Sequence, residues 1–586
     1  MRRSAALMLV LLAARPAIAQ LGPVPVPPQN PITEPKRVLG KILFWDEQLS
    51  SDNTVSCGTC HLPTSSGSDP RMTAIHPGPD GVFGTADDKR GSVGLIRSDA
   101  NGDYQPDSIF FLQPQVTRRS SNSPIMAAYQ QFLFWDGRAR TSFVDPDSGA
   151  TLIPTGGALE SQAVQPPNSD VEMAHEGRDW GAIAHKIRRD RPLALAANIP
   201  PDLQATLSTN PTYPKLFKDA FGDPDITAAR IAFALATYQR TLVPNRSPFD
   251  LNQLTPAQAS GRATFNASAC NNCHTTPLFT FPDFFNIGIR PWQEDAGRME
   301  FTGNLFERGR FKPPTLRNAG IKPDFMHNGQ FTTLEQVLDF YADPSQQFQD
   351  NIDTFLPVVI TGTARTNLID FIRNGLTDPR VRDGLFPFDR PVLAIERPET
   401  RPQLLGNGVA GAGGFTPFMI AQDPAAIGSD AFRLGLDDAL PGTHAFMAVS
   451  NNPPVNGVLS TETLVGPIST QGTTPGTGYA TFHYPIPADA LLEGQTRYFQ
   501  WRVQDSAAPG GVALSPVAAA TFFCGECEQI CLSDLNADGA VDFSDLNILL
   551  DQYQALGLGF SGDIDGNGVV NFADLNLLLG AFNQPC

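Results

Sequence analysis

The sequence predicts a multidomain protein in which regions of different fold class follow one another. A length of 586 residues is too great for one hydrophobic core and suggests about three or four domains. The apolar fraction of 41% is that of a globular protein, and 51 glycines with 52 prolines indicate many turns and long loops. Strand-like segments follow residue 414 and an acidic repeat closes the chain, so the last two regions should differ from the rest.

The first twenty residues predict export. Arg2 and Arg3 form a charged start, and Ala5–Ala14 is an apolar stretch too short to span a bilayer. Ala17–Ala19 is an A-x-A cleavage site, so we expect a signal peptide over 1–19. No later segment is long and apolar enough to span a membrane, which places the mature protein in the periplasm, at the cell surface or outside the cell. The net charge of −18 argues against nucleic acid or an anionic membrane as a main partner.

Four of the eight cysteines lie in the motifs CGTCH (57–61) and CNNCH (270–274). Two thiols three positions apart reach the two vinyl groups of one porphyrin, and the adjacent imidazole becomes an iron ligand. A redox pair or a zinc site is the alternative, but no second CxxC lies nearby to complete a zinc site. We therefore predict two covalent haem c groups, attached through Cys57, Cys60, Cys270 and Cys273, with His61 and His274 as proximal ligands.

The other cysteines are Cys524, Cys527, Cys531 and Cys586, which crowd the C-terminus without a following histidine. In an oxidising compartment they should form disulfides. Three pairings are open, and Cys531–Cys586 would enclose the last domain.

Several blocks flank the two motifs in a fixed order: LGKILFWDEQLSSDNTVSCGTCH (39–61), SNSPIMAAYQQFLFWDGRA (121–139), FNIGIRPWQEDAGRMEFTG (285–303), GRFKPPTLRNAGIKPDFMHNGQFTTLEQV (309–337) and LTDPRVRDGLFPFDRPVL (376–393). Together they resemble the bacterial dihaem cytochrome c peroxidase family, which includes the MauG-type enzymes. The resemblance covers about residues 35–395. It implies two mainly α-helical cytochrome c-like lobes with a calcium ion between them. The N-terminal haem would be the peroxide site and the C-terminal haem the electron-transfer site.

The resemblance also implies the residues around the first haem. In the family, a glutamine, a proline and a glutamate follow one another at a fixed spacing, and ESQAVQPPNSDVEM (160–173) supplies Gln162, Pro166 and Glu172 at that spacing. Glu172 is our candidate acid–base group and Gln162 its polar neighbour. Trp135 corresponds to the tryptophan that bridges the haems. It lies farther from Gln162 than in relatives, because residues 143–159 look inserted.

Two positions remain open at the sequence level. His76 is a candidate distal ligand of the first iron, with His175 and His185 as rivals, although we expect a mainly open, five-coordinate iron. For the second iron, Met326 offers a thioether and Tyr341 a phenolate. Family register favours Tyr341, because the peroxidase branch carries Met there and the MauG branch carries Tyr. Met326 is then interpreted as a packing residue.

Two kinds of calcium site are expected. The family resemblance implies an ion between the haems, held by the Asn122 side chain and by the carbonyls of Lys322 and Asp324. In addition, DLNADGAVDFSD (534–545) and DIDGNGVVNFAD (563–574) repeat an EF-hand-like loop and resemble dockerin repeats. Oxygen ligands fall at loop positions 1, 3, 5, 7, 9 and 12, which are Asp534, Asn536, Asp538, Ala540, Asp542 and Asp545, then Asp563, Asp565, Asn567, Val569, Asn571 and Asp574.

The expected domains follow from these features. After the signal peptide, 20–38 is an N-terminal extension, 39–250 the first lobe, 251–396 the second lobe, and 397–414 a linker. Residues 415–523 form a β-sandwich-like domain, since YFQWRV alternates like a half-buried strand. Residues 524–586 form the dockerin-like calcium module, which would fold with calcium and bind a surface or protein partner.

Three functions are compatible with these residues. The leading one is an exported peroxidase that reduces hydrogen peroxide with electrons from a small cytochrome c or cupredoxin, which enter at the second haem. The second is a MauG-like oxidase of a protein or organic substrate. The third is a non-catalytic electron-transfer cytochrome displayed by its tail, which the retained Gln162, Pro166 and Glu172 disfavour.

Overall fold

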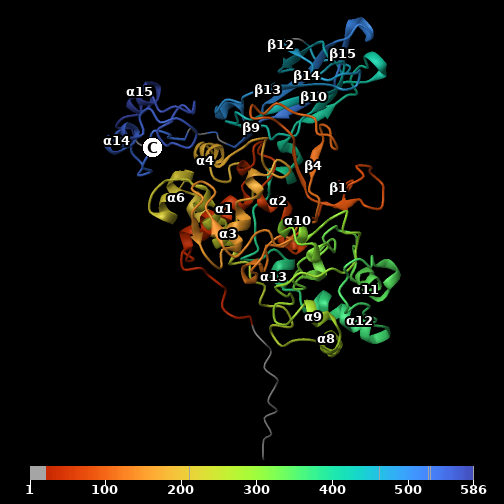
Figure 1. The fold of residues 1–586 in the computed structure, drawn as a ribbon. Coiled ribbons are helices and arrows are strands. Elements are labelled where there is room, and N and C mark those ends of the chain that lie inside the picture. The colour runs from red at the N-terminus through yellow and green to blue at the C-terminus, as the bar shows by residue number, and fades with distance from the viewer. Residues whose placement is uncertain (1–20, 210, 461, 526, 528–529, 585–586) are drawn as a thin grey trace, which may run out of the picture.

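The computed structural model describes residues 21–584 except 210, 461, 526, 528 and 529. The predicted signal peptide and Cys586 lie outside the described residues. Figure 1 shows two helical regions at the centre and lower right, a β-rich domain above them and a small helical module at the left. Within the described part of the chain, no helix combines the length and apolarity that a bilayer span requires.

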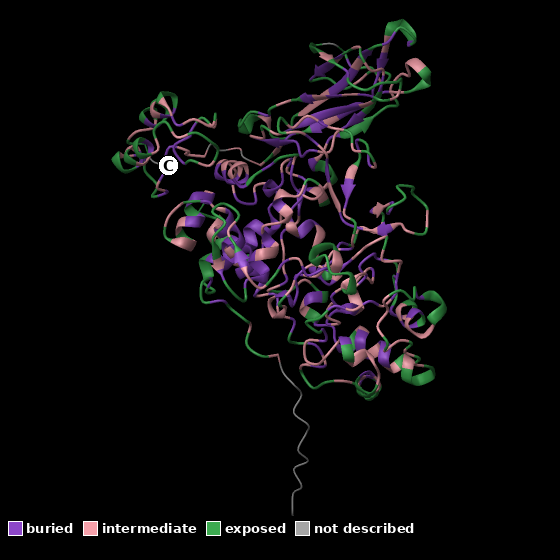
Figure 2. Cartoon of the chain, viewed as in Figure 1, coloured by how far each residue is buried: buried purple, intermediate pink, exposed green. Residues whose placement is uncertain are grey.

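The first lobe is built around two helices that cross closely. Its helices are α1 Glu34–Trp45, α2 Cys57–Cys60, α3 Ala158–Ala163, α4 Trp180–Arg189, α5 Pro201–Leu207, α6 Tyr213–Phe221 and α7 Ala228–Gln239. At the crossing, a Cβ atom on Gly40 of α1 would lie 1.9 Å from the carbonyl oxygen of Ala234 of α7, so only glycine fits there. The surrounding core is the largest purple region in Figure 2. Glu160 of α3 forms a fully buried ion pair with Arg240, which follows α7, and this pair fixes α3 against the core.

The chain of the first lobe also forms short β-hairpins between α2 and α3. They consist of β1 Ile75–His76 with β2 Lys89–Arg90, β3 Val93–Ile96 with β4 Pro114–Val116, and β5 Phe143–Val144 with β6 Thr151–Ile153. The segment that looked inserted in the sequence, 143–159, therefore forms the β5–β6 hairpin and the start of α3. Phe143 and Ile153 at its base are buried in the first-lobe core.

The second lobe is smaller and its core is aromatic. Its helices are α8 Pro256–Ala267, α9 Cys270–Cys273, α10 Arg298–Thr302, α11 Leu334–Ala342, α12 Gly362–Asp370 and α13 Pro379–Arg382. Phe249, Phe265, Phe279 and Phe371 pack edge to face or tilted at 5.1–6.3 Å between ring centroids. The two helical regions thus have separate hydrophobic cores.

The chain returns to the first lobe at the end of the second. Val381, Phe388 and Leu393 pack into the first-lobe core. Asp389 pairs with Lys41 of α1 at 2.8 Å, and the Glu47 carboxylate accepts the amide hydrogens of Ala394 and Ile395. The sequence placed the whole of 251–396 in the second lobe. Tertiary packing instead closes the first lobe with residues 381–395.

Two sheets form the predicted sandwich. One sheet has the order β13-β10-β8, and the other has the order β12-β11-β14-β16-β7 with β15 beside β14. The strands of this region are β7 Gln403–Leu405, β8 Phe418–Ile420, β9 Ala426–Ile427, β10 Arg433–Ala439, β11 His444–Ser450, β12 Thr463–Ser469, β13 Gly478–His483, β14 Thr496–Gln504, β15 Val512–Leu514, β16 Val517–Thr521 and β17 Phe523–Cys524. Residues of both sheets share one core, in which Trp501 donates to the carbonyl of Gly435 on the facing sheet. Because β7 pairs with β16, the domain begins inside the predicted linker 397–414.

The sandwich contacts the first lobe through a buried arginine. Arg433 lies fully buried between Asp423 of its own domain and Asp52 of the first lobe, at 3.1 and 3.2 Å. The same guanidinium stacks over the ring of Tyr104, 4.4 Å from its centroid. A buried charge paired on both sides of an interface ties the two domains together.

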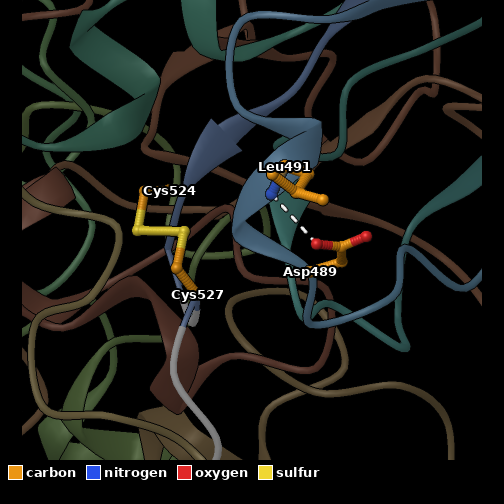
Figure 3. Close-up of a disulfide and its surroundings, with 4 residues drawn as sticks. All are labelled: Asp489, Leu491, Cys524 and Cys527. Atoms are coloured by element: carbon orange, nitrogen blue, oxygen red, sulfur yellow. Dashed lines mark hydrogen bonds between the residues drawn. A yellow bond between two sulfur atoms is a disulfide. The ribbon is translucent and has the colours of Figure 1, made fainter.

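A disulfide marks the exit from the sandwich. Cys524 and Cys527 are bonded to each other directly after β17, beside the turn in which the Leu491 amide donates to Asp489 (Figure 3). Cys531 is also disulfide-bonded. With Cys524 and Cys527 paired, two of the three pairings that the sequence left open are excluded. The last module follows, with helices α14 Phe543–Asp551 and α15 Phe572–Gly580.

Candidate active site

The two CxxCH histidines have the same local geometry. His61 follows α2 with φ −126° and ψ 60°, and His274 follows α9 with φ −125° and ψ 60°. In each case the ring Nδ1 lies close to a carbonyl oxygen, 3.0 Å from Gly67 for His61 and 3.1 Å from Phe279 for His274. A carbonyl can only accept, so Nδ1 carries the proton and Nε2 keeps the lone pair that an iron needs. Both histidines are thus oriented as axial ligands.

One large cavity opens beside the first motif. It has a volume of about 670 Å³ and is lined by Cys57, Cys60 and His61 together with Trp135, Gln162, Pro166 and Glu172. The four candidate catalytic residues come from separate segments of the chain, yet all of them face the space next to His61. The inserted hairpin 143–153 is not among the described residues that line this cavity.

Glu172 sits where its proton affinity is raised. Burial raises the pKa of its carboxyl above the usual value of a glutamate, and the nearby Arg138 opposes part of this effect. Burial raises the pKa values of the Cys57 and Cys60 thiols, and the Glu172 charge adds to this effect, so the carboxylate lies near both thiols. A Cβ atom on Gly94 of β3 would lie 1.8 Å from the carbonyl oxygen of Val171, which shows how tightly β3 holds this segment.

Trp135 lines the cavity beside the first motif and contacts segments from both lobes. Its indole nitrogen donates to the carbonyl of Ser120 at 2.7 Å, and its ring meets the ring of His327 edge to face at 6.3 Å. The Trp135 carbonyl accepts from the backbone amide of Lys312. Trp135 is thereby joined through the backbone to the segment 309–337, which belongs to the second lobe.

The candidate distal histidines differ in place. His76 lines the first cavity, but its Nδ1 accepts the Gly78 amide hydrogen at 3.1 Å. In the neutral imidazole the proton then sits on Nε2, which makes that nitrogen a donor rather than an iron ligand. His175 is not among the described residues that line this cavity, and His185 faces the C-terminal module. This geometry favours the expected open iron.

At the second site, Tyr341 and Met326 pack against one shared hydrophobic cluster, but only Tyr341 also packs against the cluster that contacts Cys270. Tyr341, on α11, packs against the same hydrophobic cluster as Cys270. Burial raises the pKa of its phenol well above the usual range, and the charges of Cys273 and Cys270 add to this effect. Met326 lines the first cavity instead, in a left-handed backbone conformation with φ 71°. Tyr341 is thus beside the second attachment motif, and its role as ligand stays a prediction.

Lys312 is a cavity residue that the sequence patterns missed. It is 5% exposed and lines the first cavity, where its ammonium donates to the side-chain oxygen of Gln130. Within the described residues it makes no ion pair with a carboxylate, and burial lowers its pKa to about 7. A buried ammonium without an anion is costly, and a haem propionate would supply that anion. This cavity therefore fits haem. The one signal in the sequence is a lysine inside an apolar and proline-rich segment.

The inter-haem calcium residues meet at the boundary of the lobes. Asn122 lines the cavity, and its amide nitrogen is buried without a partner, so a reversed amide would present its oxygen instead. The Lys322 ammonium binds the Asp324 carboxylate at 3.0 Å and Ser68 at 2.8 Å, and Ser120 also donates to Asp324. This calcium site stays a prediction, with the carboxylate of Asp324 as an additional hard oxygen beside it.

The two C-terminal loops have matching structures. The position 12 carboxylates of Asp545 and Asp574 each accept two amide hydrogens from the start of their own loop, at 2.7 and 3.0 Å. Carboxylate oxygens of Asp563, Asp565 and Asp574 lie within 4.8 Å of one another. In the first loop, the side-chain oxygen of Asn536, a predicted ligand, is buried without a partner. A calcium ion would satisfy that oxygen and neutralise the clustered carboxylates, so the loops fit the ion.

The fold and site define the class of protein: a two-lobed c-type cytochrome with two haem attachment motifs and a cavity at one of them. Residues 34–255 match the family model described as di-haem cytochrome c peroxidase. The methylamine utilization protein MauG of Methylorubrum extorquens is 30% identical over 367 residues, which cover 61% of this chain and 82% of that protein. A cytochrome-c peroxidase of Pseudomonas sp. strain SCT is 28% identical over 411 residues, covering 63% and 88%. The cytochrome c551 peroxidase of Nitrosomonas europaea is 28% identical over 313 residues, covering 51% and 71%.

The chain belongs to the dihaem cytochrome c peroxidase family. It is an oxidoreductase of the peroxidase type, and membership implies two haem c groups.

Proposed function

We propose that this protein reduces hydrogen peroxide to water at the His61 site, with electrons that enter at the His274 site from a small cytochrome c or cupredoxin. The observation that carries the proposal is the single cavity that brings Glu172, Gln162 and Trp135 next to His61. Two electrons and two protons convert one peroxide into two waters. When bound, the haems supply the redox chemistry, and the chain supplies proton transfer, orientation and the path between the sites.

Each residue has a defined task in this proposal. Glu172 would take a proton from one peroxide oxygen and deliver it to the other, leaving oxygen, a task for which a raised pKa suits it. Gln162 donates to the charge that develops as the oxygen–oxygen bond breaks. The His61 bond to Gly67 fixes the proximal ring, and Lys312 would hold a propionate of a bound haem.

The MauG-like oxidase is the second candidate, and Tyr341 beside Cys270 favours it. A phenolate ligand stabilises ferric and higher-valent iron and makes a poor entry point for electrons. Such an enzyme would store oxidising equivalents and remove electrons from a protein or organic substrate. The third candidate, a non-catalytic electron carrier, leaves the polar groups of the cavity without a task.

One optical experiment separates the three. Peroxide is added to the fully ferric protein and, separately, to the half-reduced protein, and the haem spectra are recorded. A reaction only after half-reduction, with steady turnover of a reduced donor, supports the peroxidase. A reaction in both states supports the MauG-like oxidase, and no reaction in either state supports the electron carrier.

We also propose that the protein is exported and that the C-terminal loops bind calcium. The Cys524–Cys527 disulfide supports an oxidising compartment. The paired loops, the carboxylate cluster and the unpartnered Asn536 oxygen support calcium. Whether the module also holds a surface or protein partner is a separate question, which a pull-down with the calcium-loaded protein addresses.

A further inference from the structure

The C-terminal module is strongly acidic, and it lies against a basic face of the first lobe. Residues 530–586 contain eight aspartates and no lysine, arginine or histidine. Figure 1 shows this module beside α4 and above α6. Arg189 in the last turn of α4 and Lys218 of α6 reach the module, whereas Lys186 bonds within the lobe and Arg188 is buried. Opposite charge on two facing surfaces favours and orients their contact.

One face of α4 is shaped for close approach. Gly181, His185 and Arg189 recur every four residues and so share a face, while Ile183, Ala184 and Ile187 are buried in the lobe core. A Cβ atom on Gly181 would lie 3.1 Å from the carbonyl oxygen of Leu558 in the module. The module backbone thus lies directly against a helix position that has no side chain.

Each calcium loop is held by one basic residue of the lobe. Both terminal nitrogens of Arg189 donate to the carbonyl of Ile564 at 3.0 Å, in the second loop. The Lys218 ammonium donates to the carbonyls of Asn536 and Ala537 at 2.9 and 3.3 Å, in the first loop. These carbonyls come from the second to fourth positions of the two loops. The contact therefore depends on the conformation of the loop backbone.

We propose that this basic face, formed by Gly181, His185 and Arg189 of α4 with Lys218 of α6, is an intramolecular docking site for the calcium-loaded C-terminal module. Calcium fixes the loop backbone and neutralises its carboxylates, which keeps the carbonyls in the positions that Arg189 and Lys218 bind. The calcium part rests on the proposed loop sites and is independent of the peroxidase proposal. In the docked state the repeat-related Phe543 and Phe572 stay 70% and 62% exposed, so a face of the module remains free.

The test uses the full-length holoprotein in calcium and measures its radius of gyration by solution scattering. Arg189→Glu with Lys218→Glu reverses the charge of the docking site and should enlarge the radius as the module swings out. Gly181→Leu should do the same while raising the helix propensity of α4, so its effect cannot come from a weakened helix. Lys215→Glu is the matched control, because this exposed lysine of α6 pairs only with Asp219 among the described residues. It should leave the radius unchanged.

A second pair of variants isolates calcium. Asp534→Asn with Asp563→Asn removes the first ligand of each loop without touching the lobes, and should enlarge the radius as far as the charge reversal does. An unchanged radius in both docking-site variants overturns the docking site. An unchanged radius in the loop variant, together with lost calcium binding by titration, overturns the role of calcium. Haem spectra and peroxide turnover are recorded in parallel and should match wild type throughout, so a failed peroxidase proposal leaves this test intact.

Discussion

The two haem lobes share a proximal side and differ on the distal side. His61 and His274 have matching backbone angles and the same Nδ1 contact to a carbonyl. On the distal side each lobe has a helix with a Leu-Glu pair near its start, Leu159–Glu160 in α3 and Leu334–Glu335 in α11. Six residues after the glutamate stands Pro166 in the first lobe and Tyr341 in the second. The proline side chain has no atom that can bind iron, whereas the tyrosine side chain has its phenol oxygen.

The turn before these helices repeats in the same way. Phe134 and Met326 both have a left-handed backbone, with φ 63° and 71°, and both lie in turns closed by an isolated antiparallel bridge. Met326 therefore corresponds to a phenylalanine that packs in the other lobe. The comparison teaches that the attachment motifs are common to the lobes, and that our prediction of an open first site and a closed second site rests on one position, Pro166 in one lobe and Tyr341 in the other.

The largest expected effect comes from Glu172→Gln, which tests the open site. The amide keeps the shape of the side chain but cannot move a proton, so peroxide turnover should fall by about 10²- to 10⁴-fold. Burial raises the pKa of Glu172. Glu172 must be ionised to take the proton, so wild-type turnover should fall as the pH drops through a value above the usual pKa of a glutamate. This acidic limb of the pH profile should be absent in the variant. Haem content and the spectrum of the second haem should not change. A variant with wild-type turnover would place the proton transfer elsewhere.

The sequence was informative wherever chemistry demands fixed spacing. The CxxCH motifs and the repeated acidic loops are local in the chain, so the residues that the structure brings together there could be named in advance. Packing between segments that are distant in the chain could not be predicted from the sequence. Residues 381–395 return to the first lobe because Val381, Phe388 and Leu393 complete its core, and β7 adds to the sandwich edge within an expected linker. Lys312 was missed for the same reason, since its burial depends on contacts from Gln130 and Trp135.

Tyr341→Phe tests the closed site and should have the next largest effect. Losing an anionic oxygen ligand should raise the reduction potential of the second haem by a substantial part of the roughly 0.8 V range that axial ligands span. The spectrum of that haem should change from six- to five-coordinate. The matched control is Phe340→Tyr, which adds a phenol next to the ligand position on the same helix and should leave the second potential in place. If the spectrum and potential of the second haem were unchanged in Tyr341→Phe, Tyr341 would not be the ligand, and Met326 would become the candidate ligand of the second iron.

Lys312→Met should have the smallest effect, and it tests whether the reduction potentials of the two haems can be changed independently. The methionine keeps the length of the side chain and removes its charge, which in the proposal compensates a propionate of the first haem. Loss of a nearby positive charge favours the oxidised form, so the first potential should fall by tens of millivolts, about 60 mV for each tenfold stabilisation of the oxidised state in a one-electron couple. Lys312→Arg keeps the charge and should restore most of the potential. The measurement is spectroelectrochemical titration of both haems in one sample, with stability followed by thermal unfolding. If only the reduction potential of the second haem shifted, Lys312 would compensate a propionate of that haem and not of the first. Lys312 would then couple the two lobes, as the proposal expects of Trp135.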